Sequence, residues 1–205
     1  MSNSDVVVLR RRSIDRVLVA LGLVVTIVLV VAGALLTWGS NFADDYVGKE
    51  LRAQNIYFSP KEALEAEGRT DLVKYAGQQV VNGKQAEAYA SYIDGHLKET
   101  AEGKTYADLG TPERAARTAV ADATKAGKSA EEVATLQAEL DKISGQRNTL
   151  FKGETLRGLL LSTYAWSTIG RIAGIAAVVA YIAAVVMLLL VVAGLFHVLR
   201  KPKTA

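Results

Sequence analysis

The chain of 205 residues has no cysteine and only two histidines. Without cysteine it can form neither a disulfide bond nor a thiolate zinc site. His96 lies in a polar segment and His197 at the far end of an apolar run long enough to cross a membrane, so the two are not expected to share an iron centre within one chain. Neither the G-x-S-x-G nor the H-E-x-x-H motif occurs. The sequence therefore predicts no catalytic residue, no metal site and no cofactor.

Alternating apolar and polar residues, the pattern of a half-buried strand, are also missing at any useful length. Alanine is abundant between residues 39 and 168, and β-branched and aromatic residues are sparse there. We therefore expect an all-α fold.

Two long segments lack charge. Val17 to Trp38 is a run of 22 residues without Asp, Glu, Lys or Arg, and Ile172 to Val198 is a similar run of 27 residues. About 20 apolar residues suffice for a helix to cross a bilayer. Buried helices of a soluble protein are the alternative, but two such runs flanked by basic residues favour a two-span membrane protein.

The basic residues predict the orientation. They cluster before the first run and after the second, at Arg10, Arg11, Arg12, Arg16, Arg200, Lys201 and Lys203. By the positive-inside rule both termini are cytoplasmic and the middle of the chain is exported through the plasma membrane. A cleaved secretory signal is the alternative for the first run, but its apolar core would be only about 7–15 residues long.

This topology predicts five segments. They are a basic N-terminal tail (1–16), a first span (17–38), an exported small helical bundle (39–168), a second span (169–198) and a basic C-terminal tail (199–205). The exported segment has 19 acidic and 16 basic residues, a net charge of −3, so we expect no nucleic-acid partner.

Capping signals divide the exported segment into helices. Capping boxes are predicted at Ser59–Glu62 and Ser129–Glu132. Further helices are expected from Asp71 to Gly83, from Lys84 to Glu102 and from Thr111 to Gly127. The predicted helix from Lys84 to Glu102 places five residues on one stripe: Ala86, Tyr89, Ala90, Ile93 and Leu97.

The last exported helix is expected to continue into the second span. Its seam is formed by Val133, Leu136, Leu140, Ile143 and Leu150, and Arg147 interrupts it.

Small residues on the two spans predict close helix packing. The candidates are Gly22, Gly33, Ala34, Gly170, Gly174 and Ala177. We expect Gly33 or Ala34 to lie near the Gly174–Ala177 face. The partner helix could be the other span or a second copy of the chain.

One exported motif has no assigned role. It comprises Ile93, His96, Gly103, Lys104, Thr105 and Tyr106. A phosphate-binding loop at Gly103–Thr105 would need a glycine at position 98, which is Lys98. We expect His96 to be a partly exposed helical residue that meets Glu99 or water.

The stretch AYASYIDGHLKETAEGKTYADLG between two spans resembles a group of small actinobacterial membrane proteins, often labelled automatically as aromatic ring-opening dioxygenases. The label implies extradiol cleavage with ferrous iron. Our leading hypothesis is instead a non-enzymatic membrane protein whose exported domain binds an envelope partner, a membrane complex or another copy of itself. A two-span sensory or ligand-binding module and a dioxygenase subunit are the alternatives.

Overall fold

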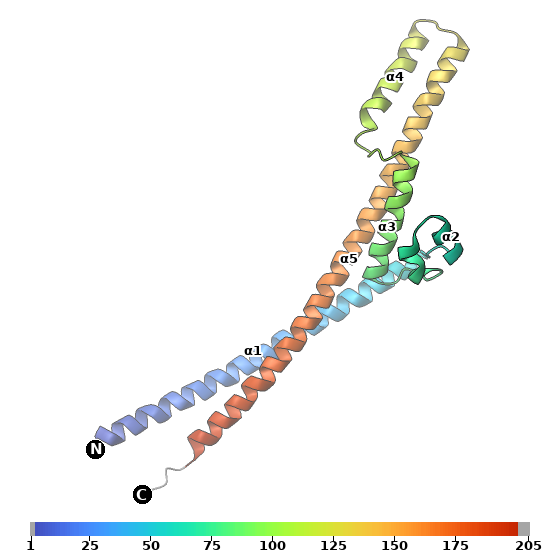
Figure 1. Ribbon diagram of the computed structural model, residues 1–205. Coiled ribbons are helices and arrows are strands. Elements are labelled where there is room, and N and C mark those ends of the chain that lie inside the picture. Colours follow the sequence, from blue (N-terminus) through green and yellow to red (C-terminus); the bar gives the residue numbers. More distant parts are fainter. Residues whose placement is uncertain (1–2, 201–205) are drawn as a thin grey trace. The chain divides into compact units, whose positions relative to one another are not determined.

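The computed structural model describes residues 3–200, and side chains from Ser13 onward. It consists of helices joined by short turns (Figure 1). They are α1 (Asn3–Ala53), α2 (Lys61–Ala66), the 3-10 helix η1 (Thr70–Tyr75), α3 (Gly83–Thr100), α4 (Gly110–Lys125) and α5 (Ala130–Leu199). Within residues 3–200 no strand forms beyond one isolated bridge between Tyr57 and Gln79. The all-α prediction is confirmed.

The chain divides into two compact units. The paired-helix unit comprises Met1–Tyr46 and Thr168–Ala205, and the multi-helix unit comprises Val47–Ser167. Both α1 and α5 contribute a segment to each unit. The predicted first span ends at Trp38, whereas the paired-helix unit includes eight more residues of α1.

The paired-helix unit is built from two antiparallel helical segments. Val19 lies against Gly194, Gly33 against Tyr181, and Ala43 against Gly170. Residue numbers therefore rise along α1 as they fall along α5. Both helices are long and apolar enough to cross a membrane.

The multi-helix unit has a main hydrophobic core at the end of α1. Val47 and Leu51 of α1 meet Leu64, Leu72 and the start of α3 there. Leu64 is fully buried. Phe58 stacks on Tyr75 at 5.1 Å and meets the edge of Tyr89 at 5.3 Å. Aromatic contacts thus hold the irregular segment after α1 onto α3.

Two predictions for this irregular segment are wrong. Ser59 does not cap α2: its hydroxyl lies 2.9 Å from the Tyr92 hydroxyl, and Pro60 occupies the cap position. The helix expected from Asp71 to Gly83 ends at Tyr75, because Gly77 adopts a φ of +67°. Residues after it run extended, and the Val80 amide donates to the Ile56 carbonyl. Asn82 then begins α3 and accepts a hydrogen bond from the Gln85 amide.

A second, smaller core joins α3 to α5. Leu97, Ala101, Leu109 and Leu150 are its buried members. Gly153 lets the helices approach, since a Cβ added there would lie 2.4 Å from Leu97 Cδ2.

Beyond this core, α4 and the start of α5 form a hairpin (Figure 1). Gly127, with a φ of +65°, forms its turn, and Ser129 Oγ accepts from the Glu132 amide. The Ser129 half of the predicted capping box is confirmed, whereas the Glu132 carboxylate forms an ion pair with Lys128 at 3.0 Å. The predicted continuation of the last exported helix is also confirmed, as α5 runs unbroken from Ala130 to Leu199.

Candidate functional site

The surface around His96 is formed by α3 and the turn after α2. His96 Nε2 lies 3.6 Å from Glu67 Oε2, too far for a hydrogen bond but close enough for an ion pair when the imidazole is protonated. The His96 ring also meets the Tyr92 ring edge-on, with centroids 4.5 Å apart. His96 is 46% exposed, so the predicted partly exposed position is confirmed. The predicted contact of His96 with Glu99 is wrong, because the fold places Glu67 beside His96 instead.

Tyr92 is a residue that the predicted stripe missed. It is buried, and its hydroxyl lies 2.9 Å from Ser59 Oγ and donates to Glu67 at 3.4 Å. Of the five predicted stripe residues, Ala86, Ala90 and Leu97 are buried, while Tyr89 and Ile93 are half-buried. Burial raises the pKa of Tyr89 above its ordinary value. The predicted stripe is narrower than the buried face of α3, because Ser59 and Glu67, which lie outside α3, also contact Tyr92.

Arg69 fixes the turn after α2 to α3. Its guanidinium donates to the Ser91 carbonyl and hydroxyl, both at 2.9 Å, and to both carboxylate oxygens of Asp71. Hydrogen bonding from Arg69 lowers the pKa of Asp71. A side chain at Gly95 would come within 3.3 Å of this guanidinium. A long-range arginine clamp of this kind has no local sequence signal.

Together, Glu67, Arg69, Tyr92, His96 and Glu99 line a small surface hollow. Among the described residues, no three His, Asp or Glu side chains come together in a metal-binding arrangement. The polar side chains that line the hollow therefore bind one another and connect the turn after α2 to α3.

The Gly103–Tyr106 motif forms the connection between α3 and α4. Gly103 ends α3 with a φ of +77°. The Thr105 amide donates to Asp108 Oδ2 at 2.8 Å, and the Asp108 amide donates to Thr105 Oγ1 at 3.2 Å. The first of these bonds is the main cause of the lowered pKa of Asp108. Lys104 lies 3.8 Å from Glu102, with both side chains largely exposed.

Tyr106 connects this motif to α5. The Arg147 guanidinium lies 4.1 Å above the Tyr106 ring and forms an ion pair with Glu113 of α4. Ser144 also donates to Glu113 at 2.9 Å. Hydrogen bonds from Arg147 and then Ser144 lower the pKa of Glu113. Arg147, which interrupts the apolar seam, therefore joins three elements of the multi-helix unit.

The small residues of the paired-helix unit lie at its helix contact. A Cβ added at Gly33 would lie 2.7 Å from the Tyr181 ring, and one at Gly174 would lie 2.8 Å from Ser40 Oγ. Gly22 is similarly close to Val191, and Gly170 to Ala43. These contacts bring two backbones close together, as small residues do in membrane helices.

The predicted register of this pair is wrong. Gly33 lies against Tyr181, not against the Gly174–Ala177 face, and Ala34 is exposed. Ala177 is buried. The register is displaced because the Tyr181 ring occupies the space that Gly33 leaves open. The Tyr181 hydroxyl lies 3.4 Å from Thr37 Oγ1, which fixes the ring at this position.

Comparisons with protein-family models, with curated proteins and with solved structures found no match to this chain. The resemblance to small actinobacterial membrane proteins therefore stays a prediction. The function is argued below from the two units alone.

Proposed function

We propose that the chain is a non-enzymatic integral membrane protein of the plasma membrane. In this proposal α1 and α5 cross the bilayer, both termini are cytoplasmic, and the multi-helix unit is exported and binds a protein partner of the envelope. The exposed apolar surface of the paired-helix unit is the observation that carries it.

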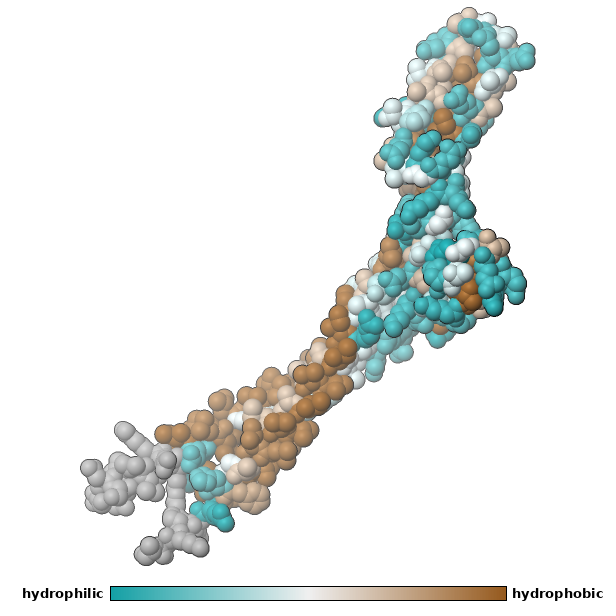
Figure 2. Space-filling view, in the orientation of Figure 1, coloured by the Kyte–Doolittle hydropathy of each residue, from teal (hydrophilic) through white to brown (hydrophobic). Residues whose placement is uncertain are grey.

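That surface is too large for a helix pair in water. Only 11% of the most apolar stretch of α1 and 17% of that of α5 is buried. Large side chains such as Leu35, Ile175 and Leu189 are each about 60% exposed (64%, 61% and 64%). Figure 2 shows hydrophobic residues covering this part of the molecule and hydrophilic residues covering α2, α3 and α4. A hydrocarbon environment satisfies such a surface, whereas water does not.

Aromatic residues follow the apolar segment of α1. Trp38 stacks on Phe42 at 5.7 Å, and Phe42 stacks on Tyr46 at 5.9 Å. Trp38 and Tyr46 are both more than half exposed, as is Trp166 of α5. Exposed aromatic residues at the ends of apolar helices are typical of a membrane–water interface.

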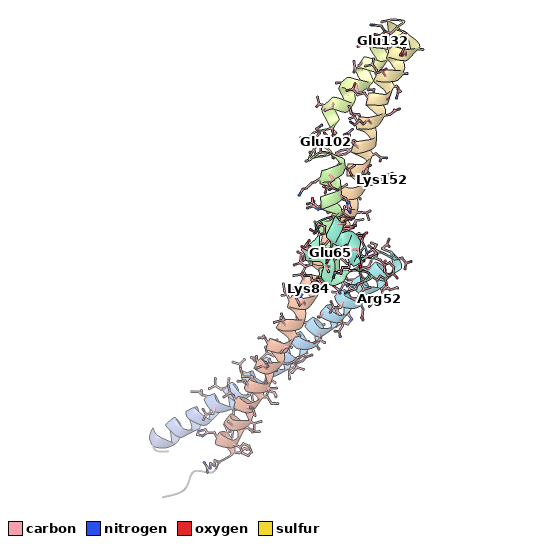
Figure 3. All side chains as sticks on the ribbon, turned by 45° about the vertical axis from the view of Figure 1, so that its right-hand side comes forward. Arg52, Glu65, Lys84, Glu102, Glu132 and Lys152 are labelled. Atoms are coloured by element: carbon pink, nitrogen blue, oxygen red, sulfur yellow. The ribbon has the colours of Figure 1, made fainter. Side chains whose placement is uncertain are left out.

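The multi-helix unit is charged over much of its surface. Its charged side chains, including those labelled in Figure 3, are exposed on every helix. On α5, however, Phe151, Leu156 and Leu159 are 57%, 49% and 63% exposed. Exposed apolar groups of this kind, surrounded by charge, are typical of protein contact surfaces. They support a protein partner over a small-molecule substrate.

Topology is tested by single cysteines, because the natural chain has none to interfere. In intact cells, a membrane-impermeant thiol reagent should label Ser129→Cys and leave Thr204→Cys unlabelled. Lysis should expose Thr204→Cys. The reverse pattern would contradict the orientation, and full extraction of the protein by alkaline carbonate would contradict membrane insertion.

Partner binding is tested on the α5 surface. Full-length protein, cross-linked in cells and purified in mild detergent, should yield a reproducible partner that Leu159→Glu loses. Lys142→Glu, at an exposed position of α5 far from Leu159, is the matched control and should retain the partner. Retention by both variants would show that this surface is not the contact.

The uninterrupted helix α5 favours the sensory module as a second candidate, because this one helix contributes a segment to both units. A small ligand that stabilises the purified protein against heat without any protein partner would favour it.

A further inference from the structure

The two helices of the paired-helix unit leave a groove at the end that carries both chain termini. Its volume is about 300 Å³, and its walls are mostly apolar. They are formed by Leu18, Val19, Gly22, Met187, Leu190 and Gly194, among others. Asp15 and His197 are its polar members.

Two glycines lie where the helices touch along the groove. Gly22 and Gly194 line it, and each sits against a valine of the other helix. A Cβ added at Gly194 would lie 3.0 Å from Val19, and one at Gly22 would lie 2.8 Å from Val191. The backbones are therefore close at these two contacts, and the groove runs beside them.

The groove ends among basic residues. The contact of Val19 with Gly194 places Arg16 at the level of His197, near the last residues of α5. Arg16 and Arg200 are both exposed. The sequence adds Arg10, Arg11, Arg12, Lys201 and Lys203 to the same two chain ends, against the acidic Asp5 and Asp15.

We propose that this groove binds an anionic phospholipid. One acyl chain lies along the groove formed by residues such as Leu18 and Leu190, and Arg16 and Arg200 hold the phosphate. The proposal rests on the membrane insertion proposed above and is independent of the envelope partner.

Charge complementarity selects this occupant. A lipid chain already has apolar surroundings in a bilayer, so it gains no hydrophobic free energy by entering the groove. The groove contributes only a matching shape, and the contacts of the headgroup decide which lipid binds. Arg16 follows the groove residue Asp15 in α1, and Arg200 comes one helical turn after the groove residue His197. Two arginines at this end of the groove favour a phosphate that carries net negative charge. The Asp15 carboxylate opposes a bare phosphate but accepts hydrogen bonds from hydroxyl groups. Phosphatidylglycerol supplies both a negative phosphate and hydroxyls, whereas phosphatidylcholine supplies neither net charge nor a donor.

The test uses the full-length protein in nanodiscs of equal phosphatidylglycerol and phosphatidylcholine. Lipids retained after transfer to mild detergent are counted by native mass spectrometry. Wild type should retain phosphatidylglycerol over phosphatidylcholine by about tenfold or more, and each of Arg16→Gln and Arg200→Gln should lower that ratio by about fivefold. Arg171→Gln, at the other end of the second apolar run, should leave the ratio unchanged.

A second pair of variants tests the groove itself. Leu190 lines the groove and Leu189 does not, although both are more than 60% exposed (62% and 64%). Leu190→Trp should displace the retained lipid, and Leu189→Trp should not. Because both side chains face away from the helix contact, both variants should fold, which circular dichroism checks.

Equal retention of the two lipids, or equal behaviour of Leu190→Trp and Leu189→Trp, would overturn this proposal while leaving membrane insertion intact. A chain that alkaline carbonate extracts would overturn both. Labelling of Ser129→Cys in the arginine variants confirms that orientation has not changed.

Discussion

The two units of this chain bring helices together by opposite means. In the paired-helix unit, contact depends on what is missing: Gly22, Gly33, Gly170 and Gly174 carry no side chain where the partner helix lies. In the multi-helix unit, contact depends on what is present, namely buried aliphatic and aromatic side chains and the clamps of Arg69 and Arg147. The proposed membrane insertion accounts for this difference, because burying apolar groups stabilises a fold in water but gains little in lipid.

The register of the paired helices can be tested by a disulfide that either forms or does not form. A Cβ at Gly174 would lie 3.6 Å from Ser40 Cβ, within the range that a disulfide spans. Ser40→Cys with Gly174→Cys should therefore cross-link within one chain under mild oxidation, as seen by a mobility shift on non-reducing gels. Ala34→Cys with Gly174→Cys should stay reduced. Cross-links found only between chains would assign the glycine face to a homodimer.

Removing a buried side chain should affect the multi-helix unit most. Leu64 is completely buried, so Leu64→Ala should lower the free energy of unfolding by about 2–5 kcal/mol. Urea unfolding of the full chain in detergent, followed by tyrosine fluorescence, measures it. The exposed Leu159→Ala should change stability by about 0.5 kcal/mol or less. Similar losses in the two variants would mean that Leu64 is not part of a packed core.

Adding a side chain should affect the paired-helix unit instead. At Gly33 a methyl group meets the rigid Tyr181 ring, so Gly33→Ala should destabilise the helix contact by about 1–3 kcal/mol. Gly39 has no atom within 4 Å of an added Cβ, so Gly39→Ala should be neutral or stabilising. Thermal unfolding in detergent compares the two. A more stable Gly33→Ala protein would refute close packing at this position.

Acid should weaken the Arg147 clamp. The pKa of Glu113 is lowered in the folded protein, so the unfolded chain binds this proton more tightly. The stability that the pair contributes is therefore present above the ordinary pKa of glutamate and is lost as the pH falls through the lowered pKa.

Thermal unfolding of wild type and Arg147→Met across this range should show wild type more stable near neutral pH. The difference in unfolding temperature between the two proteins should disappear in acid. Arg114→Met serves as the control, because the Arg114 guanidinium donates to the Thr111 hydroxyl and not to a carboxylate. A difference that is independent of pH would mean that Arg147 acts through its contact with Tyr106 alone.

The smallest effect is expected at His96. It is half-exposed and pairs with Glu67 at 3.6 Å, so His96→Gln should cost roughly 1 kcal/mol or less. Elemental analysis of the purified protein should find no stoichiometric transition metal. Iron or zinc near one atom per chain, lost in His96→Gln, would revive the dioxygenase hypothesis.

The sequence alone determined the features that depend on short-range patterns. The apolar runs fix which helix segments can enter a membrane, and the lack of alternation excludes a sheet. Gly103, Gly127 and Ser129 fix where α3 ends and α5 begins, because left-handed backbone and side-chain caps are local requirements.

Only the tertiary structure decided which distant residues meet. It directed Ser59 to Tyr92 in place of a helix cap, paired His96 with Glu67, and made Arg147 the link between α4, Tyr106 and α5. It also set the register of the paired helices through Tyr181. Such contacts depend on the shape and position of whole elements, and no spacing along one segment specifies them.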